Sequence, residues 1–166
     1  MSRELNMVKK PNVQRKMCIG IFFVVTFALL AAPALSVASP SASGGGWFCS
    51  NDEKNNFGFT VESETPPKGS LEYHGRDYRV NVKSYEINSV VISDGWVVFE
   101  GMAKVDVGYG WEDAYFYVEA YDGGEPSYLD SFRIYVLPVS GVAYSSEGVL
   151  DGGNIQVRPS SDGVIA

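Results

Sequence analysis

Alternation of apolar and polar residues is clearest between residues 94 and 137. Three segments there alternate with a period of two, namely residues 97–105, 115–121 and 131–136. Successive side chains of a β-strand point to opposite faces, so each segment predicts a strand with one apolar face. Gly101 interrupts the first apolar face and predicts a bulge or a close backbone approach. The predicted inner residues are Val97, Phe99, Phe116, Val118, Phe132 and Ile134.

Turn-forming residues separate these strands from shorter ones. Asp94 and Gly95 form a dipeptide that favours tight hairpins. We expect shorter strands at residues 57–61, 71–73, 78–82, 87–92 and 154–157. The pattern predicts an all-β fold, an antiparallel meander of seven to eight strands that forms a small barrel or a flattened β-sandwich. Pairing the segments at 57–61 and 154–157 would remove two exposed edges.

The first 38 residues have the order of a secretory signal peptide. A basic segment precedes an apolar run at residues 17–32, and small residues stand at Ser36 and Ala38. The run is short for a membrane span, but its extension to residue 38 reaches that length, so an uncleaved membrane anchor helix remains open. Either alternative places the rest of the chain outside the cytoplasm, as a secreted or cell-surface protein.

The remaining chain divides by composition into three parts. Residues 39–56 are rich in Gly, Ser, Asn and charge, which predicts a flexible linker. Residues 57–158 contain the alternating segments and form the predicted all-β domain. Residues 159–166 predict a disordered tail.

Charge is distributed unevenly along the chain. The formal net charge is −7, yet the first 16 residues contain five basic residues against one acidic residue. The other eight Lys and Arg face nineteen Asp and Glu, so the body of the protein is acidic. An acidic surface repels phosphate backbones, and we therefore expect no nucleic-acid partner. The expected membrane contact is limited to the N-terminal segment, if that segment stays uncleaved.

Side chains that carry chemistry are sparse. His74 is the one histidine, and Cys18 and Cys49 are the two cysteines, so neither a disulfide framework nor an N/S metal site is expected. The acidic residues of the loop 122–130, with Glu112 and Asp113, offer oxygen ligands for Ca²⁺ or a hydrolase carboxylate pair. Their spacing matches no EF-hand loop, and we interpret them as turn formers. We predict no catalytic residue, no metal site and no cofactor.

Tyrosines gather around the second of the three long strands. Tyr115, Tyr117 and Tyr121 alternate with Phe116, Val118 and Ala120, which places the three tyrosines on the other face of the strand. An exposed aromatic strip can stack on sugar rings or contact a protein. The three tyrosines are therefore the predicted ligand-binding residues, with a glycan or a protein at the cell surface as the partner. Ordinary cross-strand packing is the alternative interpretation.

Short segments spread over residues 57–158 carry a resemblance to a known group of proteins. They are residues 57–59, 68–73, 87–92, 98–103, 115–118, 122–126, 130–134 and 150–157. In this order they resemble an uncharacterised C-terminal β module of secreted prokaryotic proteins, often found after extracellular immunoglobulin-like repeats. The resemblance implies an all-β extracellular domain and implies no activity. In this sequence no such repeats precede the segments.

Three functional hypotheses follow from these patterns. The first is a non-enzymatic secreted or cell-surface β domain with a structural or interaction role. The alternative is a β-barrel that binds a small ligand or a glycan. A hydrolase based on the acidic hairpin ends is a third hypothesis and requires its carboxylates to cluster. An interior filled by phenylalanines would exclude a ligand inside the barrel.

Overall fold

The computed structural model describes residues 38–76 and 78–160. Its strands are β1 (Ser41–Ser50), β2 (Glu53–Glu62), β3 (Lys68–Gly75), β4 (Val80–Ser93), β5 (Trp96–Asp106), β6 (Trp111–Tyr121), β7 (Ser131–Pro138), β8 (Tyr144–Val149) and β9 (Gly152–Arg158), with the 3₁₀ turn η1 at Ser127–Leu129. The predicted leader or anchor helix, and the tail after residue 160, lie outside the described residues. In the described ranges no helix has the length and apolar character needed to cross a membrane.

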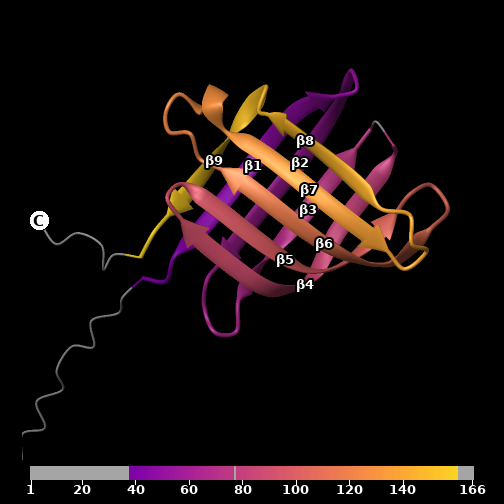
Figure 1. Ribbon diagram of the computed structural model, residues 1–166, viewed down its shortest axis with the longest axis horizontal. Helices are drawn as coiled ribbons and strands as arrows, with labels where there is room; N and C mark the ends of the chain where they lie inside the picture. The colour runs from indigo at the N-terminus through magenta and orange to yellow at the C-terminus, as the bar shows by residue number, and fades with distance from the viewer. Residues whose placement is uncertain (1–37, 77, 161–166) are drawn as a thin grey trace, which may run out of the picture. The chain divides into compact units, whose positions relative to one another are not determined.

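All nine strands belong to one antiparallel sheet that curls into a half-barrel (Figure 1). Strands β1 to β8 follow one another as a meander, and β9 pairs with β1. The predicted all-β antiparallel meander is therefore confirmed, with nine strands instead of seven or eight. Short connections keep neighbouring strands adjacent in space, as expected for antiparallel pairs.

The central strands follow the predicted alternation. Val97 and Phe99 of β5, Phe116 and Val118 of β6, and Ile134 of β7 are fully buried. Gly101 marks the predicted close approach, since a Cβ atom there would lie 2.0 Å from the carbonyl oxygen of Glu86. The bulges themselves lie in β4, where the register shifts twice against β5. They join the two strands expected at 78–82 and 87–92 into the single strand β4.

The expected flexible linker at 39–56 is wrong, because residues 41–50 form β1 and residues 53–56 begin β2. Two glycines of β1 lie where neighbouring strands leave no room for a larger side chain. A Cβ on Gly46 would lie 2.3 Å from the carbonyl oxygen of Gly152, and one on Gly44 would lie 2.6 Å from the Phe59 ring. Phe48 of the same strand is fully buried in the core. The small residues of this segment permit close strand packing.

The predicted pairing of 57–61 with 154–157 is also wrong, because β1 lies between β2 and β9. Residues 148–151, at the end of β8 and in the connection to β9, contact β1. The N–H of Cys49 donates to Oδ2 of Asp151 over 2.8 Å, and the N–H of Asp151 donates to the carbonyl of Trp47 over 3.0 Å. A Cβ on Gly148 of β8 would lie 2.6 Å from the Phe48 ring. We call this contact between β1 and residues 148–151 the seam.

Aromatic rings fill the middle of the half-barrel. The rings of Phe57 and Phe132 stack with centroids 4.0 Å apart, and Phe48 lies 6.1 Å from Phe132. Phe59 and Phe99 extend this cluster, with ring centroids 5.2 Å apart. A fully buried phenylalanine contributes about 1.5–3 kcal/mol of transfer free energy. The filled interior argues against a ligand inside the half-barrel, which was one form of the predicted small-ligand function.

The strand directions define two ends of the half-barrel. The β1–β2, β3–β4, β5–β6 and β7–β8 connections lie at one end, which we call the mouth. The β2–β3, β4–β5 and β6–β7 connections lie at the opposite end, which we call the base. The first residue of β1 and the last residue of β9, Ser41 and Arg158, are paired at the base.

Candidate functional site

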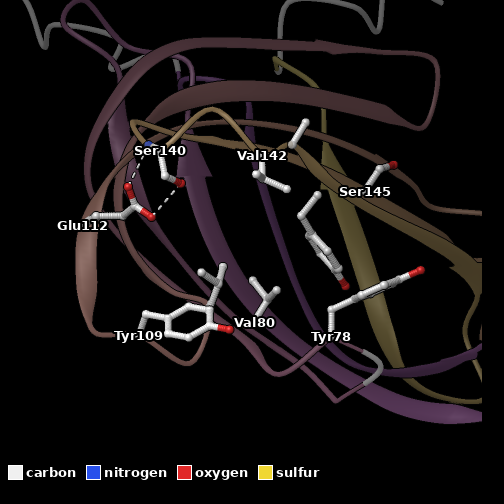
Figure 2. A pocket seen from close by; sticks show the side chains of 10 residues that line it. Tyr78, Val80, Tyr109, Glu112, Ser140, Val142 and Ser145 are labelled. Atoms are coloured by element: carbon white, nitrogen blue, oxygen red, sulfur yellow. Dashed lines mark hydrogen bonds between the residues drawn. The ribbon is translucent and has the colours of Figure 1, made fainter.

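An open pocket of about 640 Å³ lies at the mouth (Figure 2). We call it the mouth pocket; its lining residues are Tyr78, Val80, Val107, Tyr109, Glu112, Ser140, Val142, Ala143, Tyr144 and Ser145. The lining therefore combines three tyrosine rings with aliphatic side chains. Ligand pockets in proteins usually have volumes of about 300–1,000 Å³ and a predominantly apolar lining.

Strand ends position the inner part of this pocket. Val80 begins β4 and Tyr144 begins β8, and both side chains are buried. The hydroxyl of Tyr144 lies 2.5 Å from that of Tyr73, whose side chain is fully buried in β3. The ring of Tyr78 meets the ring of Tyr144 edge to face, with centroids 5.6 Å apart. Edge-to-face contacts of this kind add about 0.5–1.5 kcal/mol beyond simple burial.

Two loops form the outer part of the mouth pocket, and hydrogen bonds set the shape of each. Oδ1 of Asp106 accepts the N–H groups of Gly108 and Gly110, over 2.8 and 3.1 Å, so the loop between them turns back on β5. Both glycines have positive φ angles, of 96° and 108°, which other residues rarely adopt. This turn presents Tyr109, whose side chain is 98% exposed.

The loop between β7 and β8 is fixed to β6 by a carboxylate. Oε2 of Glu112 accepts the N–H of Ser140 over 2.9 Å, and Oε1 accepts the hydroxyl of the same residue over 3.0 Å (Figure 2). The N–H of Val139 donates to the carbonyl of Asp113 over 2.9 Å. These bonds hold Val142 at the edge of the pocket while its side chain stays 76% exposed.

The three predicted ligand-binding tyrosines lie on the outer face of β6, away from the core. Tyr115, Tyr117 and Tyr121 are half-buried, whereas Phe116 and Val118 between them are fully buried. The predicted orientation is therefore confirmed, and their binding role stays a prediction. The structure does not bring them to the mouth pocket, which none of the three lines.

Carboxylates engage the hydroxyls of two of these tyrosines. Tyr115 donates to Oε2 of Glu100 over 2.5 Å, and Tyr117 donates to Oε1 of Glu119 over 2.9 Å. Desolvation and then the bond to Glu100 raise the pKa of Tyr115 to about 12. The bond to Glu119 and then desolvation raise the pKa of Tyr117. Neither phenol ionises near neutral pH, so both tyrosines act as neutral hydrogen-bonding rings.

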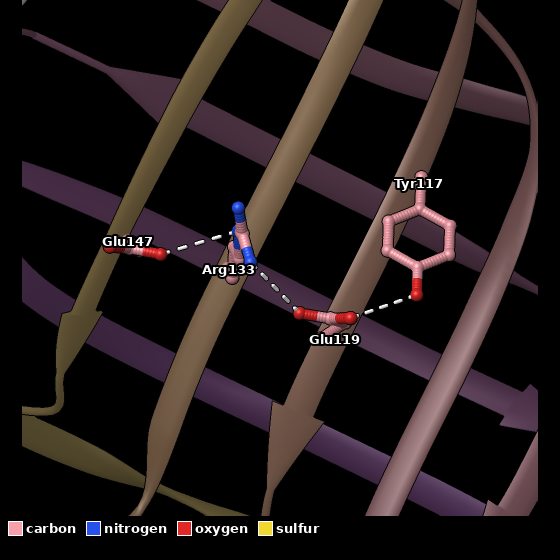
Figure 3. A network of polar contacts seen from close by, with 4 residues as sticks. All are labelled: Tyr117, Glu119, Arg133 and Glu147. Atoms are coloured by element: carbon pink, nitrogen blue, oxygen red, sulfur yellow. Dashed lines mark hydrogen bonds and ion pairs between the residues drawn. The ribbon is translucent and has the colours of Figure 1, made fainter.

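A polar network continues from Tyr117 across the outer face (Figure 3). Nη1 of Arg133 in β7 lies 3.4 Å from Oε2 of Glu119, and its Nε lies 3.2 Å from Oε2 of Glu147 in β8. These pairs are exposed, and exposed ion pairs contribute only about 0–1 kcal/mol each. At the base end of the same face, Tyr121 packs against Trp96 with ring centroids 4.7 Å apart. The outer tyrosines therefore take part in cross-strand packing.

The acidic loop at 122–130 covers the free edge of β9. Oδ2 of Asp130 accepts the N–H of Ile155 over 2.7 Å, and Oδ2 of Asp122 accepts the N–H of Val157 over 2.9 Å. The second oxygens, Oδ1 of Asp130 and Oδ1 of Asp122, accept N–H groups within the loop itself. The hydroxyl of Ser127 donates to the carbonyl of Gly153, on the same edge. These side chains take the place of a neighbouring strand.

The other candidate acids do not form a hydrolytic pair. Glu112 is bonded to Ser140 at the mouth, whereas its neighbour Asp113 forms an ion pair with Lys104 at 2.8 Å. That ion pair and the hydroxyl of Tyr85 lower the pKa of Asp113. Glu125 is exposed at the base and Asp130 is fully buried. No group of three or more metal-ligating side chains occurs within residues 38–76 and 78–160.

His74 and Cys49 each have a local environment without catalytic partners among the described residues. The Nδ1–H of His74 donates to Oδ1 of Asn81 on the neighbouring strand over 2.8 Å. Cys49 is exposed and has a free thiol. Desolvation, followed by the carboxylate of Asp151, raises the pKa of that thiol. A raised pKa lowers the thiolate fraction at neutral pH and makes the sulfur less reactive.

The sequence patterns do not predict the mouth pocket, although one signal for it is present. Tyr109 and Val142 stand in segments that the turn chemistry assigns to loops, where polar residues are usual. Exposed apolar side chains that group on neighbouring loops are typical of a surface that contacts a ligand or another protein.

Comparison of the chain with protein-family models, with curated proteins and with solved structures finds no match.

Proposed function

We propose that this protein is a non-enzymatic binding domain that acts outside the cytoplasm and holds a small apolar ligand in the mouth pocket. The observation that carries the proposal is the pocket itself, about 640 Å³ with a tyrosine and valine lining. Its size falls within the usual range for ligand sites. The interior below it is packed with phenylalanine rings, so the ligand is held at the mouth of the half-barrel.

The N-terminal pattern supports the location outside the cytoplasm. A basic segment, an apolar run at 17–32 and small residues at Ser36 and Ala38 are typical of an exported protein. The resemblance of residues 57–158 to a β module of secreted proteins points the same way. Sequencing of the N-terminus of the protein recovered from the medium and from the membrane fraction tests both the export and the cleavage of the leader.

A fluorescence titration tests the ligand site. N-phenyl-1-naphthylamine is an uncharged probe whose emission rises in apolar surroundings. We expect it to bind, and we expect Val142→Arg to weaken its binding at least about tenfold, because the bound probe would have to cover a charged side chain in place of an apolar one. Val139→Arg is the matched control. Val139 is in the same loop with a 78% exposed side chain and does not line the pocket.

The titration separates a specific site from general hydrophobic adsorption. Binding that Val139→Arg leaves within about twofold, and that Val142→Arg removes, supports the proposal. An absence of binding to the unaltered protein, or equal effects of the two variants, contradicts it. Circular dichroism of both variants must match that of the unaltered protein, which is expected because both positions are exposed loop positions.

The outer face of β6 offers a second candidate function, the binding of a glycan. Tyr115 and Tyr117 are half-exposed rings beside Glu100 and Glu119, and this combination of a ring face and a carboxylate suits a sugar. Both carboxylates already accept hydrogen bonds from the tyrosines. Glycan-array binding that is lost in Tyr115→Ala and Tyr117→Ala would support this function, and binding that is unchanged would remove it.

A further inference from the structure

We infer that the mouth pocket selects an uncharged, apolar ligand with a flat ring system, and that it discriminates against anions and cations of the same shape. This inference rests on the proposed function of the pocket and specifies the chemical class of its ligand. Three features of the described residues support it: the arrangement of the rings, the state of the one lining carboxylate, and the apolar rim.

The rings of the pocket form walls suited to a flat molecule. Tyr78 and Tyr144 meet edge to face at 75° and form one wall. Tyr109 lies on the other side of Val80 from Tyr78 (Figure 2). Aromatic faces prefer offset stacking or edge contacts with another ring, and valines pack against its edges. A planar apolar ligand would therefore contact rings and aliphatic groups at the same time.

An anion finds no positive partner in the lining. Among the ten described lining residues there is no Lys, Arg or His, and the one carboxylic acid is Glu112. A carboxylate in the wall repels an anionic ligand, and the repulsion grows where the bound ligand excludes water from the space between the two charges. An anionic group in the pocket would also lose its hydration without receiving a charged donor in return.

A cation would have to share Glu112 with Ser140, because each carboxylate oxygen already accepts one hydrogen bond from that residue. Oε2 accepts the N–H of Ser140, and Oε1 accepts the hydroxyl of Ser140. Pairing with a ligand cation would compete with the bonds that shape the loop between β7 and β8. Tyrosine rings attract a cation by about 0.5–2 kcal/mol, whereas Val80, Val107 and Val142 offer it no compensation for lost hydration. The balance favours a neutral ligand.

The apolar character continues from the pocket onto its rim. Tyr78, Tyr109 and Val142 line the pocket, and the larger part of each side chain is still exposed. Exposed apolar side chains that surround a concave site are typical of a surface that meets an apolar ligand. The rim therefore extends the contact area along the path by which such a ligand reaches the pocket.

Matched probes test the selectivity. 1-Anilinonaphthalene-8-sulfonate has the skeleton of N-phenyl-1-naphthylamine with one added sulfonate, and the phenyltrimethylammonium ion is the cationic isostere of tert-butylbenzene. We expect the sulfonated dye to bind at least about tenfold more weakly than the neutral dye. We also expect tert-butylbenzene to displace the neutral dye at concentrations at least about tenfold lower than phenyltrimethylammonium.

The outcomes of this test are separable from those of the proposed function. Equal or tighter binding of the sulfonated dye, or of phenyltrimethylammonium, at a site sensitive to Val142→Arg overturns the selectivity while the ligand site stands. An absence of any binding sensitive to Val142→Arg overturns the proposed function itself. Glu112→Gln adds a direct readout: the ratio of anion affinity to neutral-dye affinity should rise by about threefold or more, and an unchanged ratio overturns the part assigned to the carboxylate.

Discussion

Both ends of the half-barrel hold their loops with carboxylates, but only the mouth places exposed apolar side chains beside an open pocket of about 640 Å³. At the base, the carboxylates of Asp122 and Asp130 accept hydrogen bonds from backbone N–H groups of β9 and of their own loop. At the mouth, Tyr109 and Val142 extend into solvent beside an open pocket. These carboxylates resemble cation ligands in the sequence, but in the structure they stabilise the edge of β9. Exposed side chains without a structural role are therefore a better guide to function than carboxylates that bind the backbone.

The largest expected effect is the loss of the carboxylate that covers β9. Asp130→Asn leaves one acceptor oxygen where two N–H groups, of Gly123 and Ile155, now donate. A buried donor without a partner costs about 1–3 kcal/mol, and bonds to charged groups are at the strong end. We expect the free energy of unfolding to fall by about 2–3 kcal/mol in urea denaturation.

Glu125→Gln is the control for that prediction. Glu125 lies in the same loop, is exposed, and accepts one long contact of 3.3 Å from the amide of Asn154. We expect its effect to stay within about 0.5 kcal/mol. Similar losses for the two variants would show that the loop does not cover the edge of β9 as described. Faster hydrogen exchange at Ile155 in Asp130→Asn alone would locate the damage at that edge.

A somewhat smaller effect is expected at the seam. Gly148→Ala places a Cβ 2.6 Å from the Phe48 ring, and the ring is fully buried. Overpacking of this kind costs about 1–3 kcal/mol. The matched control is Gly58→Ala in β2, where a Cβ meets nothing within 4 Å. Thermal unfolding should separate the two alanines, and equal melting temperatures would contradict the close packing of β8 on β1.

The mouth should show the reverse pattern, with an effect on binding and none on stability. Tyr109→Ala removes a ring that is 98% exposed, so the free energy of unfolding should change by less than about 0.5 kcal/mol. Affinity for N-phenyl-1-naphthylamine should fall about five- to tenfold, as expected for one aromatic contact. Tyr135→Ala, on the outer face, should leave the affinity unchanged. A loss of stability in Tyr109→Ala would show that the mouth loop is part of the core.

The smallest effect concerns the outer face and appears only in alkali. The pKa of Tyr115 is raised from 10.0 to about 12, by desolvation and then by Glu100. The stabilisation by this tyrosine is thus fully present below pH 10 and is lost as the pH rises towards about 12, because the unfolded phenol ionises first. Absorbance at 295 nm should show a late-ionising tyrosine. Glu100→Gln should shift that ionisation to lower pH, and an unchanged titration would contradict the assignment.

Much of the sheet could be predicted because its central strands obey a simple rule. Residues 97–105, 115–121 and 131–136 have one buried and one wetter face, so the period of two identifies each strand and its inner side. The outward direction of Tyr115 follows from the same rule. The merger of two predicted strands into β4 could not be predicted, because it depends on bulges that Gly101 accommodates from the neighbouring strand.

The strand β1 could not be predicted, because a composition rich in Gly and Ser is equally typical of a flexible linker. Gly44 and Gly46 resemble linker residues in sequence, yet they are small because Phe59 and Gly152 come close to them in space. That crowding involves residues more than a hundred positions away in the case of Gly152. The mouth pocket is equally non-local, since its lining comes from three separate connections and the strands beside them. No periodic pattern in the sequence encodes such a meeting of loops.

The pairing of Ser41 with Arg158 has a consequence for how the domain is presented to its surroundings. The described sheet begins and ends at the base, so an attachment made at either of these two residues would lie at the end opposite the mouth. A tether at either terminus would act as a stalk and leave the pocket open to the medium. The same geometry suits surface immobilisation: a tag placed before β1 or after β9 orients every molecule with its pocket outward.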